Sequence, residues 1–260
     1  MKIFVGGCSF SSYKSGRCGV GKSWPHLLAK QHTGHQVYDC TYGGAGNDTI
    51  LHRLQILETN FGKPEKVIIQ LTTPARTGII QDKMFWKLGL GKQLTRNNLF
   101  YYDLKGRHWE PVTGAFFHPD TEKMQKKLKK NRKFGDSTLP QRSRLSQFTG
   151  LSKEILTKYF AWHLDSYDNS MRTQMTINLI NRIYGQENVF FFSWHRQDKF
   201  NSMGHINLPK NYIGSVEEKT NKLFYSYAMD ESPHYGVEGH KVVYEWLEPY
   251  VHKLLMEKLK

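Results

Sequence analysis

The chain alternates short apolar runs with longer segments in which apolar residues recur at helical spacing. Short continuous apolar runs are typical of buried parallel strands. These runs cover residues 2–6, 36–42, 66–72 and 188–194. The segments with helical spacing cover residues 23–32, 48–60, 151–184 and 237–258. Strands that alternate with helices predict βαβ units and a parallel sheet. Pro249 predicts a kink or a restart within the last helix.

Two stretches interrupt this alternation. Residues 77–150 are rich in Lys, Arg, Gly, Pro and aromatic residues, and residues 195–228 form a shorter irregular stretch. We find no internal repeat and no low-complexity linker. We therefore predict a single α/β domain over residues 1–260, with a basic insertion at about 77–150 and a shorter one at about 195–228. Ligands of open α/β sheets lie beyond the carboxyl ends of the strands, so insertions that leave from those ends would wall the site.

The composition provides ample material for a core, because 38% of the 260 residues are hydrophobic. No run approaches the roughly 18 consecutive apolar residues that a membrane helix needs. The start, MKIFVGGCSF, predicts a first strand and no signal peptide. Three cysteines without a Cys-x-x-Cys pair argue against a disulfide framework and a thiolate zinc site. We therefore expect a cytoplasmic protein without a membrane span.

The net charge is +14, from 37 Lys and Arg against 23 Asp and Glu. An excess of this size favours contact with nucleic acid, anionic glycans or acidic lipid surfaces. Residues 121–133, TEKMQKKLKKNRK, include seven basic residues and one acidic residue. This run is either a patch that binds a polyanion or a solvated insertion, and charge runs are more often the latter.

The first predicted strand ends in Gly6-Gly7-Cys8-Ser9-Phe10. A serine directly after a first strand lies at the carboxyl edge of the sheet, and the preceding glycines let the backbone turn tightly. Ser9 is therefore a candidate nucleophile. The alternative is a loop serine that caps a helix.

The second strand leads into Tyr42-Gly43-Gly44-Ala45-Gly46-Asn47-Asp48, which is followed by a predicted helix. Glycines here leave backbone N–H groups free to point at the same edge, as an oxyanion hole requires. The alternative is an ordinary turn in which Asn47 or Asp48 is the N-cap of the helix, and the two interpretations are compatible.

Asp230-Glu231-Ser232-Pro233-His234 precede the last predicted helix. A carboxylate a few residues before a histidine can orient the imidazole ring and stabilise its protonated form. This arrangement predicts a general base with its acidic partner.

These three blocks, in this order along the chain, resemble the SGNH (GDSL-type) serine hydrolases. The spacing from His234 to Gly239-His240 is similar to theirs, and Ser23-Trp24-Pro25 is similar to small SGNH-type proteins of phage and bacterial genomes. The resemblance covers residues 1–76 and 228–258. It implies a flavodoxin-like three-layer α/β/α core with a parallel sheet, and ester hydrolysis that needs no cofactor. It also implies that Ser9 is the nucleophile, His234 the base, and the N–H groups of Ser9 and Gly44 the oxyanion hole.

The sequence departs from the family pattern in three places. Gly-Cys-Ser replaces the usual Gly-Asp-Ser, and Pro74 stands where the family has an asparagine that donates to the oxyanion. Proline has no N–H to give, so we expect a substitute among Thr72, Thr73, Arg76 and Asn47. The family spacing to the histidine would select Glu231 as the triad acid. We favour Asp230, because the turn at Pro233 can absorb one residue.

Residues 16–23, GRCGVGKS, match the phosphate-binding P-loop pattern and would predict an NTPase that depends on Lys22. A P-loop follows its strand directly, however, and this strand ends near Gly7, nine residues before Gly16. The runs VIIQLTT and VFFFSW also lack the aspartate that would hold Mg²⁺. A glycine-rich loop beside the active site is the alternative.

We therefore predict a serine ester hydrolase, esterase-like or deacetylase-like, that removes an acyl group from a carbohydrate or lipid-like substrate. Thr72, Arg76 and His195 are the candidate substrate-binding residues, and the insertion at 77–150 would set the substrate. No histidine pair shows metal-ligand spacing, so we predict no metal. The alternatives are a catalytically weak SGNH-like protein that binds a polyanion such as nucleic acid, and the P-loop NTPase.

Overall fold

The protein is described from a computed structural model, which covers the sheet and the helices that pack on it. The described residues are 1–8, 10–11, 22–42, 45–72, 74, 76–80, 87–90, 99–105, 109–113, 166–194, 206–220 and 236–256. For 76–80, 87–90, 99–105, 109–113, 166–169 and 220 only the backbone is described.

A seven-stranded sheet forms the centre of the molecule, in the order β5-β6-β2-β1-β3-β8-β9. Neighbouring strands from β6 to β9 pair in parallel, and β5 pairs with β6 antiparallel. The order β2-β1-β3-β8-β9 is the flavodoxin-like order of a doubly wound α/β fold. This confirms the predicted fold class. The strands are β1 (Lys2–Gly6), β2 (Gln36–Asp39), β3 (Lys66–Leu71), β5 (Lys87–Leu90), β6 (Leu99–Lys105), β8 (Val189–Ser193) and β9 (Tyr212–Ser215).

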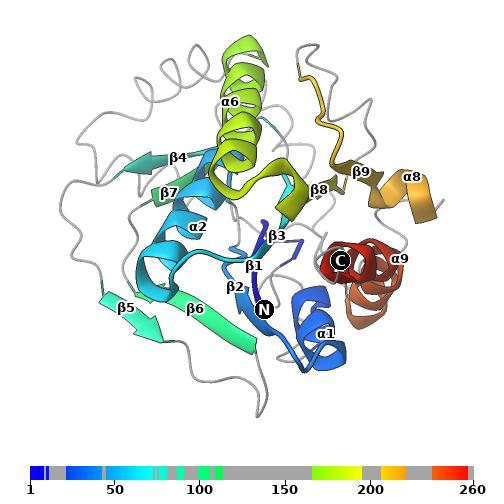
Figure 1. Ribbon diagram of the computed structural model, residues 1–260. Coiled ribbons are helices and arrows are strands. Elements are labelled where there is room, and N and C mark those ends of the chain that lie inside the picture. Colours follow the sequence, from blue (N-terminus) through cyan, green and yellow to red (C-terminus); the bar gives the residue numbers. More distant parts are fainter. Residues whose placement is uncertain are drawn as a thin grey trace, which may run out of the picture.

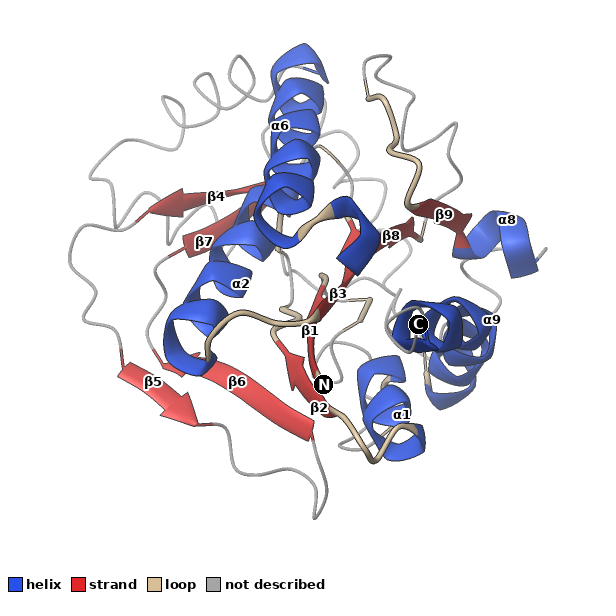
Figure 2. Ribbon diagram, in the orientation of Figure 1, coloured by secondary structure: helices blue, strands red, loops and turns tan. Residues whose placement is uncertain are grey.

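Helices cover both faces of this sheet and give three layers (Figure 1). On one face α2 packs against β1 and α6 packs against both α2 and β8. On the other face α1 packs against β2 and α9, and α8 packs against α9 (Figure 2). The helices are α1 (Trp24–Gln31), α2 (Asn47–Phe61), α6 (Ser166–Tyr184), α8 (Val216–Thr220) and α9 (Val237–Met256).

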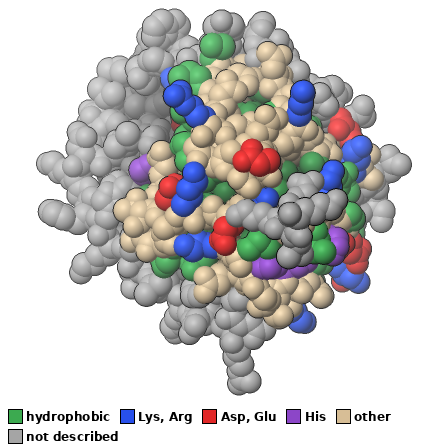
Figure 3. All heavy atoms as spheres, in the orientation of Figure 1, with side chains coloured by type: hydrophobic (Ala, Val, Ile, Leu, Met, Phe, Trp, Pro, Cys, Tyr) green, Lys and Arg blue, Asp and Glu red, His purple; other side chains and the backbone are tan. Residues whose placement is uncertain are grey.

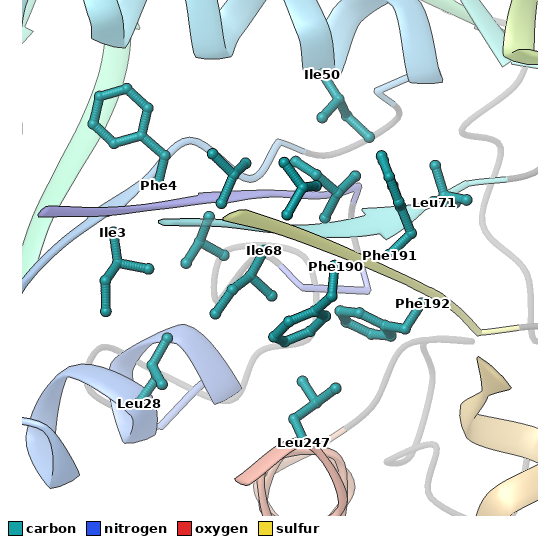
Figure 4. Packing of buried hydrophobic residues seen from close by; sticks show 14 of the residues in the cluster. Ile3, Phe4, Leu28, Ile50, Ile68, Leu71, Phe190, Phe191, Phe192 and Leu247 are labelled. Carbon is teal, nitrogen blue, oxygen red and sulfur yellow. The ribbon is translucent and has the colours of Figure 1, made fainter. Parts of the chain in front are cut away.

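The core forms because side chains alternate across the strands (Figure 4). On β1, Phe4 points toward the α2 side and Ile3 toward the α1 side. On β8, Phe192 points toward α9, where its ring lies 5.8 Å from that of Trp246, and 5.5 Å from that of Trp24 on α1. Both faces of β1, β3 and β8 are therefore buried, which explains why these strands read as continuous apolar runs.

The structure adds strands that the sequence pattern does not predict. Within the basic insertion, β6 extends the main sheet beside β2, and β4 (Arg76–Ile80) pairs with β7 (Trp109–Thr113) in a separate antiparallel ladder. Within the shorter insertion, β9 becomes the last parallel strand. Pro249 was expected to kink or to restart the last helix, and α9 continues through it without a restart. The first part of the expected helix, 151–165, lies outside the described residues.

Gly6 and Gly7 allow close packing, and neither needs a left-handed backbone conformation. Among the described glycines, positive φ occurs only at Gly62, Gly185 and Gly214. A Cβ at Gly6 would lie 2.7 Å from Cγ2 of Ile50, which belongs to α2. The absent side chain therefore lets α2 approach the end of β1.

Two further expectations concern the cysteines and membrane-spanning helices. Cys8 and Cys40 are buried free thiols, and burial raises the pKa of Cys40 to about 12. Among the described residues, no helix combines the length and apolar character that crossing a membrane requires.

We predict that Leu247→Ala lowers the free energy of unfolding by about 2–5 kcal/mol, the usual cost of a cavity in a core. Leu247 is 1% exposed and lies between α9 and the sheet. The matched control is Leu179→Ala on α6, because that side chain is 43% exposed and its loss should cost below about 1 kcal/mol. Urea unfolding of both variants measures the difference, and equal costs would contradict the described packing.

Candidate functional site

The four parallel strands β1, β2, β3 and β8 end at one edge of the sheet, where several of the candidate residues follow them in the sequence. The segments after β1, β2, β3 and β8 all leave from this edge. Of the predicted site residues, Asn47 and Thr72 lie within the described part. Ser9, Gly44, Asp230, His234 and His195 lie outside it, as does the side chain of Arg76. The surroundings of the candidate site are therefore described through the residues that flank these positions in the sequence.

Gln70, on β3, organises the chain around Ser9. Its side chain is fully buried, and its Oε1 accepts the backbone N–H of Cys8 at 2.9 Å and the hydroxyl of Ser11 at 3.2 Å. The N–H of Ser11 donates to the carbonyl of Cys8 at 3.0 Å. The two residues that enclose Ser9 and Phe10 in the sequence are thus bonded to each other and to one oxygen of Gln70.

Gly7 is required by this arrangement. A Cβ at Gly7 would lie 2.8 Å from Oγ of Ser11 and 3.1 Å from Cβ of Gln70. Both atoms are close to the backbone, so moving them away would cost free energy. A side chain at Gly7 would therefore separate Ser11 from Gln70.

Trp24 connects this cluster to the last helix. Its indole N–H donates to Oγ of Ser11 at 2.8 Å, and its backbone N–H donates to Nδ1 of His240 at 3.3 Å. His240 is buried in the first turn of α9, and its own N–H donates to the carbonyl of Gly236. A continuous buried network thus runs from the chain beside Ser9 to the helix that follows His234.

The loop after β2 is fixed on both sides of Gly43 and Gly44. The N–H of Tyr42 donates to the carbonyl of Gly7 at 3.0 Å, and the N–H of Ala45 donates to the carbonyl of Tyr42 at 3.2 Å. Arg53, from α2, donates its Nε–H to the carbonyl of Cys40 at 2.7 Å and places its guanidinium 4.7 Å from the centre of the Tyr42 ring. The first two glycine-containing loops are therefore joined directly.

Asp39 starts this loop as a buried carboxyl group. Its Oδ1 accepts the N–H of Thr41 at 2.8 Å, and its Oδ2 has no hydrogen-bond partner among the described residues. Burial raises the pKa of Asp39 to about 6, because desolvation disfavours the charged form more than Thr41 and Arg53 favour it.

Asn47 holds the end of β3. Its Oδ1 accepts the N–H of Thr72 at 2.9 Å, and its Nδ2 donates to the carbonyl of Thr72 at 3.0 Å and to Oγ1 of Thr173 on α6 at 3.2 Å. An amide has two N–H groups, so an oxyanion role for Asn47 would require it to give up one of these contacts. The N-cap of α2 is Gly46. The interpretation in which Asn47 or Asp48 is the N-cap is therefore wrong.

Aromatic side chains border the same edge. Trp194, at the end of β8, is buried, and its ring lies 5.6 Å from that of Phe10, the residue after Ser9. The carbonyl of Trp194 accepts the N–H of Glu217 at the start of α8. His195, predicted to bind substrate, directly follows this fixed tryptophan in the sequence.

Ser23 does not have the environment of a P-loop residue. Its side chain is fully buried, and its hydroxyl lies 2.6 Å from Nδ1 of His26. The P-loop chemistry would instead need this hydroxyl on Mg²⁺. Residues 16–21 of the motif lie outside the described residues.

Sequence reasoning missed the residues that support the site. Gln70 gave one signal, because it is the polar residue within the apolar run KVIIQL. Trp24 stood out only as part of Ser23-Trp24-Pro25, and Ser11 gave no signal. In the described part of the chain, no three His, Cys, Asp or Glu side chains are arranged to hold a metal ion.

No protein-family model matches the sequence, and no relative among curated proteins matches it. Among solved structures, the crystal structure of TesA is similar to this chain with a TM-score of 0.48 and 11% sequence identity. The similarity covers 98% of this chain and 99% of that chain.

We predict that Asp39→Asn stabilises the protein at neutral pH more than at acidic pH. The folded protein holds the Asp39 proton up to about pH 6, whereas the unfolded chain loses it near the ordinary pKa of about 4. The wild-type protein therefore loses stability from this group as the pH rises from about 4 to 6, by about 2–3 kcal/mol in total.

Urea unfolding of both proteins at pH 4 and pH 7.5 measures this effect. The advantage of the variant should be small at pH 4, where Asp39 is protonated and resembles asparagine, and should grow at pH 7.5. An advantage that stays constant with pH would contradict the description of Asp39.

Proposed function

We propose that the protein is a serine hydrolase of the SGNH type that cleaves an ester. One observation carries this proposal. The buried network from Cys8 and Ser11 through Trp24 to His240 joins the chain around Ser9 to the helix that follows His234. The candidate nucleophile and the candidate base are 225 positions apart in the sequence. The network gives a physical reason for them to meet at one edge of the sheet.

Covalent geometry limits how far the two residues can lie from this network. Ser9 is bonded to Cys8, and His234 is two residues before Gly236. Two residues of extended chain span at most about 7 Å. The carbonyl of Gly236 accepts a hydrogen bond from the N–H of His240. The short stretch of chain between His234 and Gly236 supports our proposal that His234 acts near the contact between α1 and α9.

In the proposed reaction, Oγ of Ser9 attacks the ester carbonyl carbon while His234 takes the hydroxyl proton. The tetrahedral intermediate then expels the alcohol, which receives that proton from His234. A water molecule attacks the acyl-serine in the same way, so that a carboxylic acid leaves and Ser9 is restored. Asp230, or Glu231, orients the imidazole ring and stabilises its protonated form.

The N–H groups of Ser9 and Gly44 would stabilise the oxyanion. The hydrogen bond from Tyr42 to Gly7 supports this pairing, because it ties the loop that contains Gly44 to the loop that contains Ser9. The absence of a third donor at Pro74 would cost on the order of 3 kcal/mol of transition-state stabilisation. The N–H of Thr72 is already taken by Asn47. The candidate substitutes are therefore the Thr72 hydroxyl, Thr73, Arg76, and Asn47 if its amide gives up one of its present contacts.

For the substrate, we propose an ester of a carbohydrate or a lipid-like alcohol. Thr72, Arg76 and His195 follow β3 and β8 at the same edge and would contact it. The insertion at 77–150 starts at this edge with β4, which supports its predicted role in setting the substrate.

A second candidate function is retention of a polyanion, which the net charge of +14 favours. On the face in Figure 3, the Lys and Arg side chains of the described residues are interspersed with Asp and Glu. The charge run at 121–133 lies outside the described residues. Binding through that run would add to the hydrolase function, or replace it if Ser9 is not activated.

The test is the reaction of the pure protein with a fluorophosphonate, followed by intact-mass measurement. We expect a single adduct, because a serine activated by a histidine reacts with such reagents whereas ordinary serines do not. Ser9→Ala and His234→Ala should each abolish the adduct. Circular dichroism of the variants shows whether they retain the fold.

A folded wild-type protein without an adduct would remove the hydrolase mechanism. Salt-sensitive retention on heparin or DNA would then support the polyanion function. An adduct that persists in Ser9→Ala would place the reactive serine elsewhere.

A further inference from the structure

We propose that Gln70 and Ser11 are positioning residues for the nucleophile, and that Trp24 extends their effect to the segment that carries the base. This inference rests on the proposed function. It assigns a role to three residues that have no counterpart among the predicted triad and oxyanion groups.

The argument starts from the hydrogen bonds of Gln70. Its Oε1 is shared by the N–H of Cys8 and the hydroxyl of Ser11, and its Nε2 donates to the carbonyl of Leu71 at 2.5 Å. The bond to Leu71 sets the orientation of the amide group, because only one end of the group can donate. The oxygen therefore faces the segment from Cys8 to Ser11, in the middle of which Ser9 stands.

Three hydrogen bonds hold the two ends of this segment. Cys8 and Ser11 both bond to Gln70, and they bond to each other. Gly7 lets the segment lie close to Gln70, since a Cβ there would meet both Ser11 and Gln70. We expect anchors on both sides of Ser9 to restrict its position, and catalytic rates respond strongly to displacements of about 1 Å.

Ser11 also passes this restraint to Trp24. A hydroxyl can donate one hydrogen bond while it accepts others, and Ser11 donates to Gln70 while it accepts the indole N–H of Trp24. The backbone N–H of Trp24 bonds to His240 on α9. The nucleophile segment and the start of α9 therefore share one network, so that a change at Ser11 should alter their relative positions.

A positioning role differs from a purely structural one in a measurable way. If the network only stabilised the fold, its loss would lower the free energy of unfolding but leave the reactivity of the folded protein unchanged. If the network positions Ser9, its loss lowers the reactivity of protein that is still folded.

The experiment measures the rate constant of fluorophosphonate labelling of Ser9 from pH 6 to 9, by intact mass, at a temperature where each variant is folded. The variants are Ser11→Ala, which removes the shared hydroxyl, and Gln70→Met, which keeps the shape but removes the acceptor. We expect the plateau of the pH profile to fall about tenfold in Ser11→Ala and up to about a hundredfold in Gln70→Met. The midpoint should stay in place, because the base itself is unchanged.

The matched control is Ser215→Ala. Ser215 is also fully buried, and its hydroxyl accepts the N–H of Glu218 at 3.1 Å, at the β9 edge of the sheet. This variant should lose stability like Ser11→Ala but label within about twofold of the wild-type rate. The double variant Ser11→Ala/Gln70→Met should fall by less than the product of the single effects, because the two side chains are in direct contact.

Gln70→Glu provides a conservative replacement in its protonated form, which burial favours, because one oxygen can accept both hydrogen bonds while the O–H donates to the carbonyl of Leu71. It should recover part of the rate lost in Gln70→Met. If Gln70→Met does not fold, Ser11→Ala and Gln70→Glu decide the matter. Wild-type labelling at Ser9 with unchanged rates in folded Ser11→Ala and Gln70→Met would overturn this inference and leave the hydrolase proposal intact. A wild-type protein that does not label would overturn both.

Discussion

The buried amide of Gln70 holds together the segments on which the candidate site depends. A buried polar group without hydrogen bonds costs about 1–3 kcal/mol, and Gln70 is fully buried in the middle of the sheet. Its partners are therefore prescribed: Leu71 on its own strand, and Cys8 and Ser11 after β1. Once Ser11 lies at this oxygen, Gly7 cannot have a side chain, and the indole of Trp24 finds its acceptor.

The contact between α1 and α9 follows from the same placement. Trp24 is both the first residue of α1 and the bridge to His240. Its ring packs edge-on against Phe192, which in turn lies against Trp246 of α9. The polar network and the aromatic cluster thus hold the same two helices to the same face of the sheet. A stable position for α9 depends on both, since the hydrogen bonds give direction and the aromatic rings give buried area.

The fold could be predicted from the sequence where burial leaves a periodic signal. The runs at 2–6 and 66–72 became β1 and β3, because strands buried on both faces are continuously apolar. The sequence pattern did not predict β6 and β9, for two different reasons. The first lies within a stretch dominated by Lys, Arg and Gly, and the second is only four residues long and contains Gly214. For the candidate site too, some residues could be predicted from the sequence and others could not. Ser9, Gly44 and His234 stand out by motif and remain predictions, but the pairing of Cys8 with Gln70 or of Trp24 with His240 joins positions too distant for any local pattern.

The position of β6 has a consequence for the exposed backbone of the sheet. Without β6, the order β2-β1-β3-β8-β9 would leave β2 as an open edge, ready to pair with another chain. The insertion covers β2 and moves that edge to β5, a four-residue strand of opposite direction. The opposite edge, β9, is equally short, has Gly214 at φ 119° and pairs irregularly with β8. Short and irregular edge strands offer few hydrogen-bonding groups in line, so both edges of the sheet in the described part of the chain are poor templates for pairing with another chain.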